Sequence, residues 1–144
     1  MRPRSIILFE RVFLGSAILA ALNVFLNYGS LREYSLRHGG AAASALLGMT
    51  IELVIALVFW FLIARRASNG AKWVLIALTA VGIPLSISDI LSGKFNELSP
   101  LYVAISVVAF LLNIVAIWLL FRADSKDWFK FRRKEAPVDS SVFD

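Results

Sequence analysis

Long apolar stretches alternate with short polar segments along the chain. One of them runs from Ala42 to Ala64, and its only ionisable side chain is Glu52. A helix of about 20 residues is enough to cross a hydrocarbon core of about 30 Å. The basic pair Arg65-Arg66 follows directly, which is typical of the cytoplasmic end of a membrane span. The pattern therefore predicts a transmembrane helix here.

Three similar stretches complete the pattern, and together they predict an all-α bundle of four transmembrane helices. We expect one transmembrane domain, residues 1–122, followed by a cytoplasmic tail, residues 123–144, that is basic and aromatic at first and then disordered. The four spans are expected at about residues 5–27, 42–64, 71–91 and 100–121.

Composition supports a membrane protein. Charged residues make up only 17% of the chain, against about 25% in soluble proteins, and they gather between the apolar stretches. The net charge of +5 is read as a topology signal, and nucleic-acid binding is not expected. The chain has no cysteine, which excludes thiolate chemistry and disulfides.

The distribution of Lys and Arg predicts the orientation. Eleven of these residues fall in the two terminal segments and the middle connection, against three in the other two connections. Positive residues collect on the cytoplasmic side of a membrane protein. We therefore expect both termini in the cytoplasm.

Several polar side chains fall inside the predicted spans and are the candidate functional residues. They are Glu10, Arg11, Asn23, Glu52, Asp89 and Asn113. A charge near the bilayer centre costs roughly 2.5–3.5 kcal/mol, so such residues tend to be paired, neutralised or functional. Asn23 and Asn27 share a helix face with small residues, and hydrogen bonding to another helix is the expected role.

Two interpretations of Glu52 stay open. Ala45, Gly48 and Ala56 lie on its helix face, so its side chain is expected to project into the bundle. It could carry protons, or it could be a structural residue that hydrogen-bonds a neighbouring span.

Glu10 and Arg11 are adjacent and point about 100° apart, so they are not expected to pair with each other. Reaching the cytoplasmic interface is the simpler role for both.

No complete catalytic or cofactor motif is found in the sequence. The single histidine, His38, falls in a predicted loop, and one nearby Glu is too little for a metal site. There is no nucleophile elbow and no phosphate-binding glycine motif. We expect no enzymatic activity, no cofactor and no metal.

The beginning of the tail combines basic and aromatic residues directly after the last span. This combination favours contact with anionic lipids at the cytoplasmic face, at about 1 kcal/mol per basic residue. The residues concerned are Lys126, Trp128, Phe129, Lys130, Phe131, Arg132, Arg133 and Lys134.

Short motifs at the span ends carry a family resemblance. RPRSIILFE with the following LGS, then ARRASN with KW, and DWF in the tail resemble a group of small four-span bacterial inner-membrane proteins with no assigned activity. The resemblance implies bacterial origin and a four-span topology, and it implies no mechanism.

Two functions remain as hypotheses. The first is a non-enzymatic scaffold or accessory subunit that packs through small-residue helix faces against another membrane protein or a second copy. The alternative is a small proton-coupled transporter or channel that uses Glu52. Small multidrug resistance transporters are similar in length and span number, but their buried Glu lies in span one, where only Glu10 is available.

Overall fold

The computed structural model describes residues 3–134, and of residues 94, 95, 127 and 131–134 it describes the backbone alone. The described chain is helical, and four of its helices are long and apolar enough to cross a membrane. This confirms the predicted all-α class. The four are α1 (Arg4–Leu26), α3 (Ser44–Trp60) with its π-helical extension η1 (Phe61–Arg65), α4 (Asn69–Leu91) and α5 (Pro100–Leu119).

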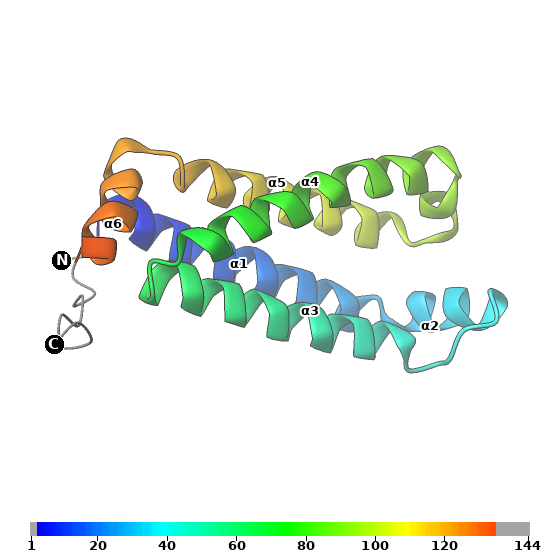
Figure 1. The fold of residues 1–144 in the computed structure, drawn as a ribbon. Coiled ribbons are helices and arrows are strands. Elements are labelled where there is room, and N and C mark those ends of the chain that lie inside the picture. Colours follow the sequence, from blue (N-terminus) through cyan, green and yellow to red (C-terminus); the bar gives the residue numbers. More distant parts are fainter. Residues whose placement is uncertain (1–2, 135–144) are drawn as a thin grey trace, which may run out of the picture.

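Shorter helices lie at the two ends of these four (Figure 1). At one end, α2 (Tyr28–Arg37) and the 3-10 turn η2 (Lys94–Glu97) connect the long helices. The sequence pattern predicts a connection over the α2 segment and gives no helix there, because its apolar positions are few. At the other end lies α6 (Ala123–Lys134), beside the start of α1 and the turn between η1 and α4. We call this second end the basic end.

Serine side chains cap two of the long helices. The Ser68 hydroxyl accepts the Ala71 backbone N–H at 3.2 Å, and the Ser99 hydroxyl accepts the Tyr102 N–H at 3.1 Å. Each cap satisfies a donor that has no partner within the helix. Pro100 follows Ser99 at the first helical position, where its missing N–H costs nothing. The two caps fix where α4 and α5 begin.

Helix α1 is the centre of the packing. It lies along α5 over most of its length and also packs against α3 (Figure 1). The main apolar core is at the basic end, where Phe9 stacks on Phe13 with ring centroids 5.2 Å apart. Side chains of α1, η1, α4, α5 and α6 close this core. Its members are Ile6, Phe9, Phe13, Ile63, Ala64, Ala67, Ala71, Leu75, Ala116, Leu119, Leu120 and Phe129.

Helix α4 is attached differently from α1. Only 6% of its most apolar window is buried within the protein, against 28% for α1. Its buried residues, Ala71, Lys72 and Leu75, are confined to its first two turns. The helix continues without interruption through Pro84, although proline removes one backbone hydrogen bond. Most of α4 therefore lies away from the main core.

Candidate functional site

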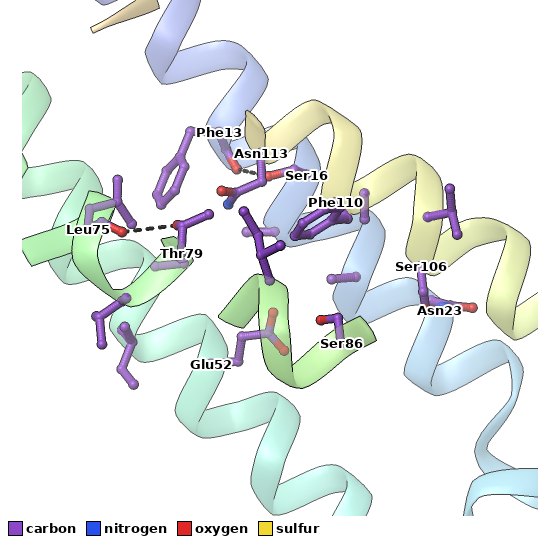
Figure 2. A pocket seen from close by; sticks show the side chains of 18 of the residues that line it. Phe13, Ser16, Asn23, Glu52, Leu75, Thr79, Ser86, Ser106, Phe110 and Asn113 are labelled. Atoms are coloured by element: carbon purple, nitrogen blue, oxygen red, sulfur yellow. Dashed lines mark hydrogen bonds between the residues drawn. The ribbon is translucent and has the colours of Figure 1, made fainter. Parts of the chain in front are cut away.

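A cavity of about 790 Å³ lies between α1, α3, α4 and α5 (Figure 2). It begins at the edge of the main core, where Phe13 and Leu75 belong to both, and extends towards the end that carries α2 and η2. The walls are mostly apolar, with hydroxyl and amide groups contributed by α1, α4 and α5 and a carboxyl group by α3. The polar lining residues are Ser16, Asn23, Glu52, Thr79, Ser86, Tyr102, Ser106 and Asn113.

Glu52 is the single charged side chain among the described residues that line this cavity. It projects from α3 towards the part of α4 that carries Ser86 (Figure 2). No described group hydrogen-bonds its carboxyl or forms an ion pair with it. The side chain remains exposed because the cavity is open at one side. Its two oxygens are therefore available to a ligand or a proton.

Asn23 joins α1 to α5 at one end of the cavity. Its amide nitrogen donates to the Tyr102 carbonyl and to the Ser106 hydroxyl, both at 2.9 Å, and its side chain is only 2% exposed. Its amide oxygen accepts from Asn27 at 3.0 Å, and the Asn27 oxygen in turn accepts from Ser99 at 2.7 Å. The interhelical hydrogen bonding expected of Asn23 and Asn27 is confirmed.

Three cavity hydroxyls donate to carbonyls of their own helices. Thr79 donates to the Leu75 carbonyl at 3.0 Å. Ser86 donates to the Gly82 carbonyl at 2.9 Å, and Ser16 makes the same kind of bond at 2.8 Å. A hydroxyl has one donor hydrogen and two acceptor lone pairs. Because each of these three hydroxyls already donates its hydrogen, its oxygen can only accept a further hydrogen bond.

Aromatic rings complete the walls of the cavity. Phe13, Phe59 and Phe110 line it together with the Glu52 carboxyl. A ring face attracts a cation within about 6 Å of its centroid. A carboxylate, acceptor hydroxyls and ring faces in one apolar cavity suit a positively charged ligand with an apolar body.

The structure separates the intramembrane candidates into two groups. Glu52, Asn23 and Asn113 line the cavity, whereas Glu10, Arg11 and Asp89 do not. Arg11 is exposed on α1, and Asp89 is partly buried near the end of α4. The contributions of Thr79 and Ser86 were not predicted. Their seven-residue spacing places them on one face of α4, and that spacing was the available signal.

Glu10 has a partner that the sequence pattern does not indicate. Its carboxyl lies 3.4 Å from the guanidinium of Arg65, which belongs to η1. The same guanidinium lies over the Trp60 ring, 5.3 Å from its centroid. The two residues are far apart in sequence, so only the packing of α1 against η1 brings them together.

At the basic end, α6 folds back onto α1. The hydroxyls of Ser5 and Ser125 share a hydrogen bond of 2.6 Å, and the Ser5 backbone N–H donates to Asp124 at 3.2 Å. Hydrogen bonding from Ser5, through its hydroxyl and its N–H, holds the pKa of the Asp124 carboxyl below its ordinary value. The start of α6 is therefore held against the start of α1 by polar contacts.

The predicted lipid-facing residues of the tail differ in exposure. Lys126 and Lys130 are exposed, whereas Phe129 is only 7% exposed and packs in the main core. Trp128 packs against the same core and is partly buried. Phe131, Arg132, Arg133 and Lys134 have side chains outside the described part of the structure, as do Arg2 and residues 135–144 altogether. Contact of the tail with anionic lipid stays a prediction.

At the opposite end, His38 lies beside Glu97, with 3.7 Å between the ring nitrogen and the carboxyl oxygen. The His38 ring also stacks on Tyr34 at 4.3 Å between centroids. No three His, Asp or Glu side chains gather in the described chain as a metal site would require. These contacts join α2 to η2.

The described chain has four helices that are long and apolar enough to cross a membrane, and such a fold suggests a multi-pass membrane protein. Comparison with models of known families, with curated proteins and with solved structures finds no match.

Proposed function

We propose that this protein is a small proton-coupled transporter of the bacterial inner membrane that binds an amphipathic cation beside Glu52. The observation that carries the proposal is the position of Glu52, as the one charged group among the described residues around a largely apolar cavity of about 790 Å³. A charged side chain is costly at this depth, and such residues commonly mark substrate or proton pathways.

The chemistry of the cavity suggests how a proton and a cation would compete. Ionised Glu52 attracts a cation, and the rings of Phe13 and Phe110 contribute contacts with its apolar body. Protonation removes the negative charge, so the cation loses its main electrostatic partner. One site that holds either a proton or a cation, but not both, can exchange one for the other across a membrane.

The loose attachment of α4 supports movement at this site. Thr79, Ile83 and Ser86 of α4 form one wall, and beyond its first two turns the helix has few contacts with the main core. A wall with few packing contacts can move at small cost in free energy. Such a movement would open and close the cavity around a bound cation.

The proposed orientation places the basic end in the cytoplasm. Arg4, Arg65, Arg66 and Arg122 all belong to segments at that end (Figure 1), and positive residues favour the cytoplasmic side. Reporter fusions at His38 and Asn69 test the orientation. Activity of a periplasm-dependent reporter at Asn69 but not at His38 would reverse it.

Transport is tested with the full chain in proteoliposomes, using tetraphenylphosphonium as the probe cation and a pH gradient as the driving force. We expect uptake by the parent protein and its loss in Glu52→Gln, because the amide keeps the shape of the carboxyl but cannot ionise. Glu33→Gln is the matched control, since Glu33 is exposed on α2 and pairs only with Arg37 at 3.5 Å among described residues.

Two results would contradict the proposal. Uptake by the parent that is unaffected in Glu52→Gln would remove this carboxyl from the mechanism. Absence of any proton flux or cation uptake by the parent, with Glu52→Gln equally stable and equally silent, would favour the other candidate function.

That second candidate is a non-enzymatic scaffold or accessory subunit, and the exposed surface of α4 favours it. Leu78, Val81 and Leu85 are each more than half exposed in the isolated chain. Helices in membranes associate through van der Waals packing, so a partner helix could lie against this surface. Mass measurement in native nanodiscs tests it, and a strictly monomeric protein with no bound partner would contradict it.

A further inference from the structure

A second concave site lies at the basic end, between α6 and the start of α4. It has a volume of about 620 Å³, and we call it the basic cleft. Four of its lining residues are basic, and none of the described lining residues is acidic. The lining residues are Arg66, Ala67, Asn69, Lys72, Lys126, Phe129 and Lys130.

Lys72 is the unusual member of this cleft. It is only 6% exposed, and no described carboxylate lies within ion-pair distance of its ammonium group. Instead, the ammonium lies 4.5 Å from the ring centroid of Phe121, 5.3 Å from that of Phe129 and 5.7 Å from that of Trp73. Buried charged groups are normally paired, because the transfer of an ion from water into the protein costs several kcal/mol of free energy. Ring faces offset this cost only in part.

The beginning of α4 adds to the positive potential of the basic cleft. The first N–H groups of a helix have no intrahelical acceptors, and they carry partial positive charge. Ser68 accepts one of them, from Ala71, while Asn69 itself lines the cleft. A helix start, a buried ammonium and three further basic side chains together match an anion with several oxygens, and phosphate is such an anion.

The surroundings of the cleft identify the source of the phosphate. Trp73 and Phe121 border Lys72 and are 55% and 40% exposed. On the same face of α4 as Trp73, the exposed residues Ala77 and Ala80 continue an apolar surface along the helix. A phosphate in the cleft would thus lie at the head of a strip suited to acyl chains. Basic pockets beside membrane helices bind lipid headgroups in this way.

We propose that the basic cleft binds the headgroup of one anionic phospholipid, with Lys72 as its central contact and Lys126 and Lys130 closing over it from α6. Bound lipid would hold α6 against the start of α4 by supplying the negative charge that the cleft lacks. This proposal requires that the chain lies in a membrane, but it does not depend on transport through the cavity.

Native mass spectrometry of the full chain, from micelles containing equal phosphatidylglycerol and phosphatidylcholine, tests the proposal. We expect one phosphatidylglycerol molecule to be retained preferentially. Lys72→Met should weaken this preference about fivefold to tenfold, since one basic residue near a headgroup contributes about 1 kcal/mol or more. Arg4→Met is the matched control, because Arg4 is exposed at the same end but does not line the cleft.

A second variant covers the case in which Lys72→Met fails to fold. Lys126 and Lys130 are both exposed on α6, so replacing them together by Met should leave the fold intact and still reduce retention. Equal loss in Arg4→Met and in the cleft variants would overturn the proposal, because it would indicate general surface attraction. Displacement of phosphatidylglycerol by an equal concentration of inorganic phosphate would also overturn it, in favour of a soluble anion.

Discussion

Helices α1 and α4 have the same length of 23 residues and are both apolar enough to cross a membrane, yet they pack in opposite ways. In α1, 28% of the most apolar window is buried inside the protein, and in α4 only 6% is. Hydropathy describes transfer from water into lipid. It does not determine which helices contact one another, because lipid tails are as apolar as leucine side chains.

The polar side chains explain the difference. Asn23 of α1 donates to two groups of α5, so its amide is satisfied only when the two helices are together. Thr79 and Ser86 of α4 donate to carbonyls of α4 itself and need no neighbouring helix. A polar side chain thus joins two helices when its hydrogen-bond donors are not satisfied by carbonyls of its own helix. In the proposed transport mechanism, α1 is therefore the fixed support and α4 the movable wall of the cavity.

The largest expected difference in unfolding free energy is between apolar side chains of α1 and of α4. Phe9 of α1 is fully buried and stacks on Phe13, so Phe9→Ala should cost about 3 kcal/mol of unfolding free energy through the cavity it leaves. Leu85 of α4 is 63% exposed, and Leu85→Ala should cost less than about 1 kcal/mol. Unfolding by detergent titration measures both. Equal costs would mean that α4 is packed as tightly as α1.

A smaller effect is expected from the polar contacts. Asn23→Leu should cost about 1–2 kcal/mol, because it removes interhelical hydrogen bonds and leaves Asn27 without one partner. Thr79→Val should change the unfolding free energy by less than about 0.5 kcal/mol, because its hydroxyl bonds only its own helix. The same titration applies, and a Thr79→Val cost as large as that of Asn23→Leu would remove the distinction drawn above.

The smallest effect concerns the start of α1, where Ser5 holds α6. Because hydrogen bonding from Ser5 lowers the pKa of Asp124 in the folded state, its stabilising contribution is complete above the ordinary pKa of about 3.9. The contribution is lost as the pH falls through the lower, folded value. The protection of α6 amides against hydrogen exchange, measured relative to the intrinsic rate at each pH, should therefore fall in acid. Asp124→Asn should abolish this pH dependence, and an unchanged profile in that variant would exclude Asp124 as its source.

Much of the fold could be predicted from hydrophobic patterning alone. Runs of about 20 apolar residues have few alternatives to membrane-spanning helices, since every backbone polar group must be satisfied internally in lipid. Helix α2 could not be predicted in this way. Its apolar residues are few, and contacts such as the Tyr28 hydroxyl to the Ala42 carbonyl, at 3.2 Å, arise only in the folded chain.

The candidate site could be predicted only in part. The small residues beside Glu52 indicated that its carboxyl faces other helices, and it does line the cavity. The cavity itself depends on the gap that α4 leaves after its first turns, and no local pattern encodes a gap. The burial of Lys72 was missed for a similar reason, because its aromatic neighbours Phe121 and Phe129 are distant in sequence.

Cysteine accessibility tests the central claim most directly, since the natural chain contains no cysteine. Ser86 lines the cavity, whereas its neighbour Leu85 points outward and is 63% exposed. In proteoliposomes, we expect a water-soluble maleimide to label Ser86→Cys and tetraphenylphosphonium to slow that labelling, while Leu85→Cys stays unlabelled in lipid. If Ser86→Cys proves as inert as Leu85→Cys, or reacts at the same rate with and without the cation, the cavity is not an open cation site.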